Sequence, residues 1–195
     1  MQASVFQRIA LCTLGLLACA LAHGSDLSEK LQSADHVLLM RHALAPGLGD
    51  PANYTLADCK TQRNLSTEGR QQAVVVGDWL RHRGVTNAAV YSSPWCRCKD
   101  TAQLLGFNGW QIEPTLASFF DEMHKGPAQS RQLQSFIAEK LKTKGKQPLI
   151  LVTHHVNIFE FAGENISSGD LVLAKVDAKG KMVSYQVIPR PNAAR

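Results

Sequence analysis

Short apolar runs alternate with longer amphipathic stretches along most of the chain. Residues 36–40, 88–91 and 148–153 are largely apolar runs with the length of buried strands, and residues 111–116 form a weaker one. The stretches between them repeat apolar residues at helical spacing. This alternation predicts an α/β domain with three layers, α/β/α, around a mostly parallel central sheet.

Four stretches are expected to be helices, at residues 66–84, 94–105, 128–141 and 155–163. Ser66 is a residue type that caps the N-terminus of a helix, and Gly84 is one that ends a helix. Residues 171–176 and 182–188 predict a final hairpin at the edge of the sheet.

The N-terminal segment has the features of an export signal. It carries one basic residue, Arg8, then an apolar core at residues 9–17, and the small side chains of Ala20 and Ala22 stand where signal peptidase requires them. The apolar core is shorter than the roughly 20 residues that span a bilayer.

We therefore expect a signal peptide at residues 1–22 and a mature domain at residues 23–195, periplasmic or secreted and without a membrane span. Lipid attachment at Cys19, as in a lipoprotein, is the alternative. The composition, with 45% hydrophobic and 19% charged residues, excludes a disordered or fibrous chain. The sequence does not indicate the oligomeric state.

The formal net charge of +5 favours small anionic partners. The basic residues form no track interleaved with aromatic residues, so no nucleic-acid partner is expected. No glycine-rich phosphate loop is present, so neither ATP nor NAD is expected as a cofactor.

Cysteine use fits export. Outside the leader the chain keeps Cys59, Cys96 and Cys98, which allows one disulfide and one free thiol, or three reduced thiols. Cys96 and Cys98 lack the two-residue gap of a zinc knuckle, and no second pair exists, so no metal site is expected.

Residues suited to phosphate chemistry follow the predicted strands. Arg41 and His42 end the first strand, Arg97 follows the second, and His154 and His155 follow the strand at 148–153. The carboxyl ends of parallel strands meet at one edge of a sheet, so we expect these side chains to converge there.

The converging residue types match phosphoryl transfer. Guanidinium groups bind phosphate oxygens, a neutral imidazole can attack phosphorus, and a nearby carboxylic acid can protonate the leaving alkoxide. A single histidine after a strand is more often a surface group, but here three strand ends agree. We assign function to Arg41, His42, Arg97 and His154, and we expect the next helix to turn His155 away. Three further histidines, His36, His82 and His124, are expected to have no role.

Four segments resemble the histidine phosphatase superfamily, also called the phosphoglycerate mutase-like family. Residues 39–43 resemble its Arg-His-Gly signature, with Ala in place of Gly, and residues 65–69 are similar to its Leu-[Ser/Thr]-x-x-Gly element. Residues 91–102 resemble its Ser-Ser-x-x-x-Arg-x-x-x-Thr-Ala segment, and His154 occupies the place of the second family histidine. In order and spacing these segments cover roughly residues 37–158.

The resemblance implies a phosphoglycerate mutase-like fold and a covalent phosphohistidine at His42. Arg41, Arg97 and His154 would then form the rest of the phosphate pocket. The implied activity is that of a metal-independent phosphomonoesterase of the histidine acid phosphatase type, acting in the cell envelope on a small phosphorylated substrate such as an envelope sugar phosphate. The alternatives are a non-catalytic phosphate- or phosphosugar-binding protein and a mutase-type phosphotransferase.

The resemblance also bears on the general acid. Many family members place a glutamate where this chain has Ser118. Residues 118–122 are similar to the exported lipopolysaccharide core heptose-phosphate phosphatase group, in which a glutamate lies near this position. Glu122 is therefore the expected general acid, with Asp121 as the runner-up.

A disulfide is the last expectation that follows from the resemblance, which brings Cys59 to the same rim as Cys96 and Cys98. We expect Cys59 to pair with one of these two. They point about 200° apart on a helix, so only one of them can face Cys59.

Overall fold

A six-stranded sheet forms the middle layer of the computed structural model, which describes residues 25–192. Its strands are β1 (His36–Arg41), β2 (Ala89–Ser92), β3 (Gln111–Ile112), β4 (Leu149–Thr153), β5 (Leu171–Val176) and β6 (Met182–Ile188), in the order β3-β2-β4-β1-β5-β6. Strands β1 to β4 run parallel, whereas β5 is antiparallel to β1, and β6 to β5. The prediction of a mostly parallel sheet with a hairpin at its edge is confirmed.

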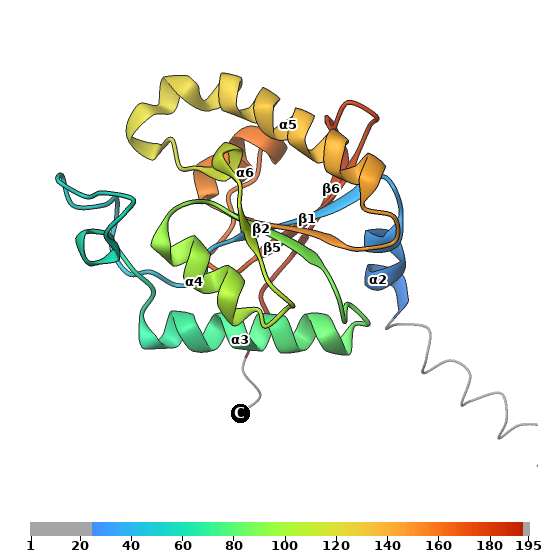
Figure 1. Cartoon of the computed structure of the whole chain (residues 1–195), viewed down its shortest axis with the longest axis horizontal. Coiled ribbons are helices and arrows are strands. Elements are labelled where there is room, and N and C mark those ends of the chain that lie inside the picture. Colours follow the sequence, from blue (N-terminus) through green and yellow to red (C-terminus); the bar gives the residue numbers. More distant parts are fainter. Residues whose placement is uncertain (1–24, 193–195) are drawn as a thin grey trace, which may run out of the picture.

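Helices cover both faces of the sheet (Figure 1). The α-helices are α2 (Ser25–Gln32), α3 (Thr67–His82), α4 (Cys96–Leu104), α5 (Gly126–Thr143) and α6 (His155–Ala162), and the 3₁₀ helices are η1 (Cys59–Thr61), η2 (Pro114–Leu116) and η3 (Phe120–Lys125). Alternate side chains of β1 enter separate cores, because Leu38 and Met40 pack with α2, α3 and α4 while Val37 and Leu39 pack with α5 and α6. The three-layer α/β/α prediction is confirmed.

The four predicted helices are present with the expected signals. The Ser66 side chain accepts a hydrogen bond from the Gly69 backbone N–H and caps α3, and α6 ends at Gly163, whose φ is +74°. Helix α2 was not predicted, because its eight residues are too few to show a helical period beside the leader. The leader expected at residues 1–22, with Cys19, lies outside the described residues.

The predicted strand at residues 111–116 is too long. Only Gln111 and Ile112 pair with β2, and the chain then turns into η2. The Glu113 side chain accepts from the Thr115 backbone N–H, and Pro114 has no N–H to give to a neighbouring strand. These two residues replace the end of the strand with a turn.

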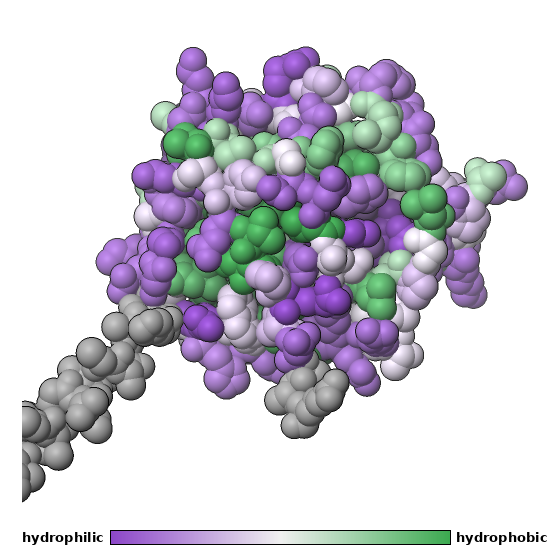
Figure 2. Space-filling view, turned by 180° about the vertical axis from the view of Figure 1, so that it is seen from behind, coloured by the Kyte–Doolittle hydropathy of each residue, from purple (hydrophilic) through white to green (hydrophobic). Residues whose placement is uncertain are grey.

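The face turned away from the view of Figure 1 is mainly polar. Seen from behind, polar side chains surround an apolar patch in the middle of the molecule (Figure 2). Within residues 25–192, no helix has the length and apolar character needed to cross a bilayer.

Candidate active site

The carboxyl ends of three adjacent strands meet at one rim of the sheet. The His42 backbone N–H donates to the Thr153 carbonyl at 2.9 Å, and the Ser93 N–H donates to the Val152 carbonyl at 2.9 Å. These bonds set the residues that follow β1, β2 and β4 side by side. The predicted convergence at the strand ends is therefore observed.

His42 is buried at this rim, with 1% of its surface exposed. Its Nδ1 lies 2.8 Å from the Ala43 carbonyl oxygen, and since a carbonyl can only accept, Nδ1 carries the proton. Burial holds the pKa of His42 well below its usual value, and the charge of Arg97 lowers it further. The ring is thus neutral with a lone pair on Nε2, the form that can attack phosphorus.

His154 lies beside His42, with their ring centroids 5.4 Å apart. Its Nε2 is 2.8 Å from the Ser93 hydroxyl, and its Nδ1 is 3.4 Å from Nη2 of Arg97. Because a guanidinium only donates, Nδ1 accepts and the proton is on Nε2. Burial and the Arg97 charge lower the pKa of His154 as well.

Both predicted arginines present a buried donor at this rim. Arg41 donates from Nη1 to the Ile166 carbonyl at 2.7 Å, and Arg97 is 3% exposed in an ion pair with Asp50. The Nε atoms of Arg41 and Arg97 are buried and have no hydrogen-bond partner within the described residues. Buried N–H groups of this kind suit the oxygens of a bound oxyanion.

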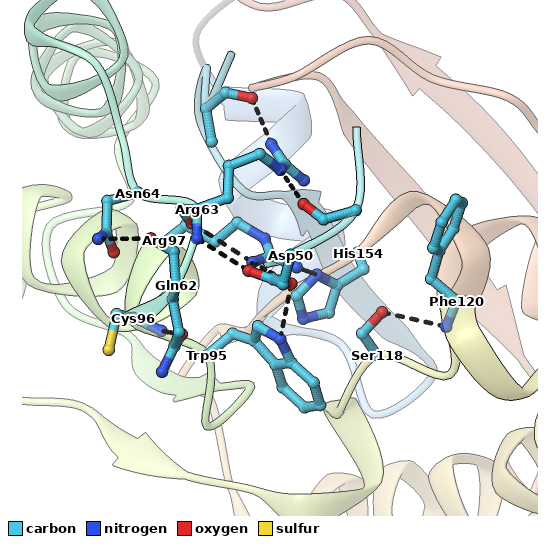
Figure 3. A network of polar contacts seen from close by, with 12 residues as sticks. Asp50, Gln62, Arg63, Asn64, Trp95, Cys96, Arg97, Ser118, Phe120 and His154 are labelled. Carbon is cyan, nitrogen blue, oxygen red and sulfur yellow. Dashed lines mark hydrogen bonds and ion pairs between the residues drawn. The ribbon is translucent and has the colours of Figure 1, made fainter. Parts of the chain in front are cut away.

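A pocket of about 50 Å³ opens at the rim, and Arg41, His42, Arg97 and His154 all line it. Figure 3 shows how side chains from several segments gather around Asp50 beside this pocket. Other chemically active residues in its lining are Asp50, Arg63, Ser118, Asp121 and His155. The described residues contain no cluster of three or more histidine, cysteine or acidic side chains that could hold a metal.

Asp50 and Arg63 were not among the predicted site residues. Both belong to the irregular stretch between β1 and α3, where no hydrophobic period shows which side chains turn inward. The sequence features that could have identified these two residues are their immediate neighbours in the chain. Asp50 stands between Gly49 and Pro51, and Arg63 lies two residues before the Leu of the Leu-Ser-x-x-Gly element.

The structure does not bring Glu122 into the pocket, which corrects the expected placement. Glu122 is exposed, forms an ion pair with Lys125 at 2.6 Å, and does not line the pocket, whereas Asp121 does. The hydrogen bond from Lys125 lowers the pKa of Glu122, which disfavours the protonated form that a general acid needs. Ser118, at the family's acid position, also lines the pocket.

His155 is not turned away from the pocket as predicted. It lines the pocket half-buried, and its ring centroid lies 5.7 Å from that of Phe120. It is the first residue of α6, and Cα–Cβ bonds tilt toward the N-terminus of a helix, here toward the rim. The expectation that the helix turns His155 away did not include this tilt.

Cys59 and Cys96 form a disulfide, and Cys98 is a buried free thiol. The expectation that Cys59 pairs with one of these two cysteines is confirmed, and the partner is Cys96. Burial raises the pKa of Cys98 to about 12, so this thiol stays protonated and unreactive near neutral pH.

Reduction of this disulfide is expected to lower both the stability of the fold and its affinity for phosphate, because Cys96 precedes Arg97. The two cysteines are separated by 37 residues, for which chain entropy gives about 3–4 kcal/mol in the free energy of unfolding. Urea unfolding and calorimetric titration with inorganic phosphate, each with and without a phosphine reductant, measure the two effects. Equal phosphate affinity in both redox states would contradict the link to Arg97.

Comparison with known proteins matches the sequence to a protein family. The sequence matches the family model described as histidine phosphatase superfamily (branch 1) over residues 37–149, more than half of the chain. No curated protein matches the sequence.

Solved structures share the fold at low sequence identity. The protein histidine phosphatase SixA, complexed with tungstate, is 19% identical with a TM-score of 0.55, covering 80% of this chain and 97% of its own. A mycobacterial glucosyl-3-phosphoglycerate phosphatase in complex with VO3 is 13% identical with a TM-score of 0.59, covering 81% and 100%. A phosphoserine phosphatase from Entamoeba histolytica, in complex with 3-phosphoglyceric acid, is 14% identical with a TM-score of 0.53, covering 77% and 95%.

Proposed function

Because the chain belongs to the histidine phosphatase superfamily, we propose that it hydrolyses phosphomonoesters through a covalent phosphohistidine on His42. The observation that carries this proposal is the environment of His42. Its Nδ1–H faces the Ala43 carbonyl, which leaves Nε2 as the nucleophile next to two buried arginine donors. The structural neighbours named above are phosphatases.

The reaction has two steps. Arg41 and Arg97 bind the non-bridging phosphoryl oxygens, and Nε2 of His42 attacks phosphorus as the bond to the leaving oxygen breaks. A general acid protonates that oxygen. Water then attacks the phosphohistidine and gives a proton to the conjugate base of the acid, the nitrogen–phosphorus bond breaks, and His42 and the acid are regenerated with release of phosphate. The guanidinium charges offset the charge on the equatorial oxygens in both steps.

Release of phosphate from 4-nitrophenyl phosphate by the purified protein tests this proposal. A phosphate-binding protein without catalysis would bind inorganic phosphate but release none from the ester. A mutase would transfer the phosphoryl group to a phosphoglycerate acceptor in preference to water. Sustained hydrolysis with water as the sole acceptor is the expected result.

We further propose that the enzyme acts after export, on a small phosphorylated substrate such as an envelope sugar phosphate. The leader-like residues 1–22 support export, and so does the Cys59–Cys96 disulfide, because such bonds persist in oxidising compartments. N-terminal sequencing of protein from the native host should then begin at His23. A phosphorylated envelope sugar belongs in the first substrate screen.

Asp121 is the general acid that the geometry favours over Glu122, since only Asp121 lines the pocket. With a poor alkyl leaving group, Asp121→Asn is expected to lower the rate of hydrolysis by about 10²–10⁴-fold. With 4-nitrophenolate, which needs little protonation, the loss should be much smaller. Glu122→Gln is the matched control, and the assignment is wrong if it alone shows this dependence on the leaving group.

A further inference from the structure

One buried carboxylate in the pocket has no role in the steps above. The Asp50 side chain is 5% exposed, and Nη1 of Arg97 lies 3.0 Å from both of its oxygens. Trp95 donates from Nε1 to Oδ2 at 3.2 Å, and the Arg63 backbone N–H donates to Oδ1 at 2.9 Å (Figure 3). Asp50 is therefore fixed by three donors from two separate segments of the chain.

The atoms that Asp50 contacts determine which side of Arg97 is left for a ligand. In a guanidinium, Nε–H and one N–H of Nη2 are parallel and form a fork that matches two oxygens of a phosphate, whereas Nη1 lies on the other side. Asp50 takes only Nη1. Nη2 has two N–H groups, one of which donates to His154 Nδ1 at 3.4 Å, so the Nε–Nη2 edge of Arg97 lies beside His154. Its Nε is buried and has no hydrogen-bond partner within residues 25–192.

The loop that carries Asp50 is tied to the start of α4 by more than this ion pair. The Cys59–Cys96 disulfide is one tie, and the Cys96 backbone N–H donates to Oε1 of Gln62 at 2.9 Å as another. The Arg63 side chain donates to the Gly49 carbonyl at 2.7 Å and so holds the loop beside Asp50. The carboxylate therefore has a fixed position relative to Arg97.

Two other roles of Asp50 would be that of a general acid and that of a charge that repels phosphate. Both of its oxygens already accept hydrogen bonds from N–H groups, so neither is available to a leaving group as an acid. If Asp50 acted only through its charge, this carboxylate in the lining of the pocket would repel a phosphate and weaken its binding. Each of these roles predicts a different result when Asp50 is changed.

We propose that Asp50 is a positioning residue, which holds the guanidinium of Arg97 so that its Nε–Nη2 fork meets the transferring phosphoryl group. This inference rests on the proposed function for its catalytic meaning. The orientation of the Arg97 guanidinium toward a bound oxyanion can be measured by phosphate binding, without turnover.

Calorimetric titration with inorganic phosphate provides the test. Asp50→Asn keeps the volume of the side chain but replaces one acceptor with a donor. It is expected to weaken phosphate binding, and to lower kcat/KM for 4-nitrophenyl phosphate, by about 10–100-fold, the cost of misplacing a binding group by about 1 Å. Asp58→Asn is the matched control, because Asp58 lies on the same loop, is exposed, and only caps η1. It should leave both quantities unchanged.

A double-mutant cycle separates positioning from a structural role. Arg97→Lys keeps the charge but removes the fork, so Asp50→Asn should change phosphate affinity within only about twofold in that background. Equal losses in both backgrounds would overturn the proposal. Tighter phosphate binding by Asp50→Asn would also overturn it, since that result means that Asp50 acts by repulsion.

A measurement on the wild-type protein covers the case in which Asp50→Asn fails to fold. The Nε–H resonance of Arg97, assigned by its loss in Arg97→Lys, should shift when inorganic phosphate is added. An unchanged resonance at saturating phosphate, or no phosphate binding at all, would overturn the inference. If the wild-type protein binds phosphate with this shift but hydrolyses no phosphomonoester, the proposed function fails, whereas the orientation of Arg97 toward a bound oxyanion, which Asp50 is proposed to hold, stands.

Discussion

The His42→Ala variant is expected to lose phosphomonoesterase activity by roughly 10⁴–10⁶-fold, the scale for removal of a covalent nucleophile. His42 is buried among packed residues, so the variant should be checked by circular dichroism before its rate is interpreted. His82→Ala is the matched control, because His82 is exposed on α3, away from the pocket. Steady-state hydrolysis of 4-nitrophenyl phosphate measures both variants. Near-normal activity of folded His42→Ala would refute the nucleophile assignment.

The Arg97→Ala variant is expected to lose both activity and stability. Removal of an arginine that stabilises a transferring phosphoryl group costs on the order of 10³–10⁵-fold in rate. The same change leaves the buried Asp50 carboxylate without its cation, which is expected to lower the free energy of unfolding by about 3–5 kcal/mol. Urea unfolding and kcat/KM on the same preparation measure the two losses.

The double variant Arg97→Ala with Asp50→Ala separates these losses. It should recover part of the free energy of unfolding, because no unpaired buried charge remains, but none of the rate. Recovery of activity in the double variant would contradict a direct role of Arg97 at phosphorus.

The strand ends were the most predictable part of the site. Arg41, His42 and His154 directly follow buried apolar runs, and parallel strand pairing leaves such residues only one edge of the sheet on which to meet. Arg97 could be placed because it opens the helix after β2. Local pattern and sheet topology were sufficient for these four positions.

The remaining pocket residues depend on contacts that no local pattern encodes. Asp50 and Arg63 face the pocket because a disulfide and several side-chain bonds fold an irregular loop onto α4. Asp121 and Glu122 are neighbours, but the backbone of Glu122 is not helical, with φ −138° and ψ +56°, and the two side chains diverge. A kink of this kind decides which carboxylate reaches the pocket, and the sequence contains no signal for it.

Trapping the covalent intermediate tests whether His42 is the nucleophile. The wild-type protein is mixed with phosphomonoester labelled at phosphorus, the reaction is quenched with base during turnover, and the labelled peptide is mapped by mass spectrometry. We expect one phosphoramidate, stable to base and labile to acid, on His42. Label on any other residue, or active enzyme that never carries label, would contradict it.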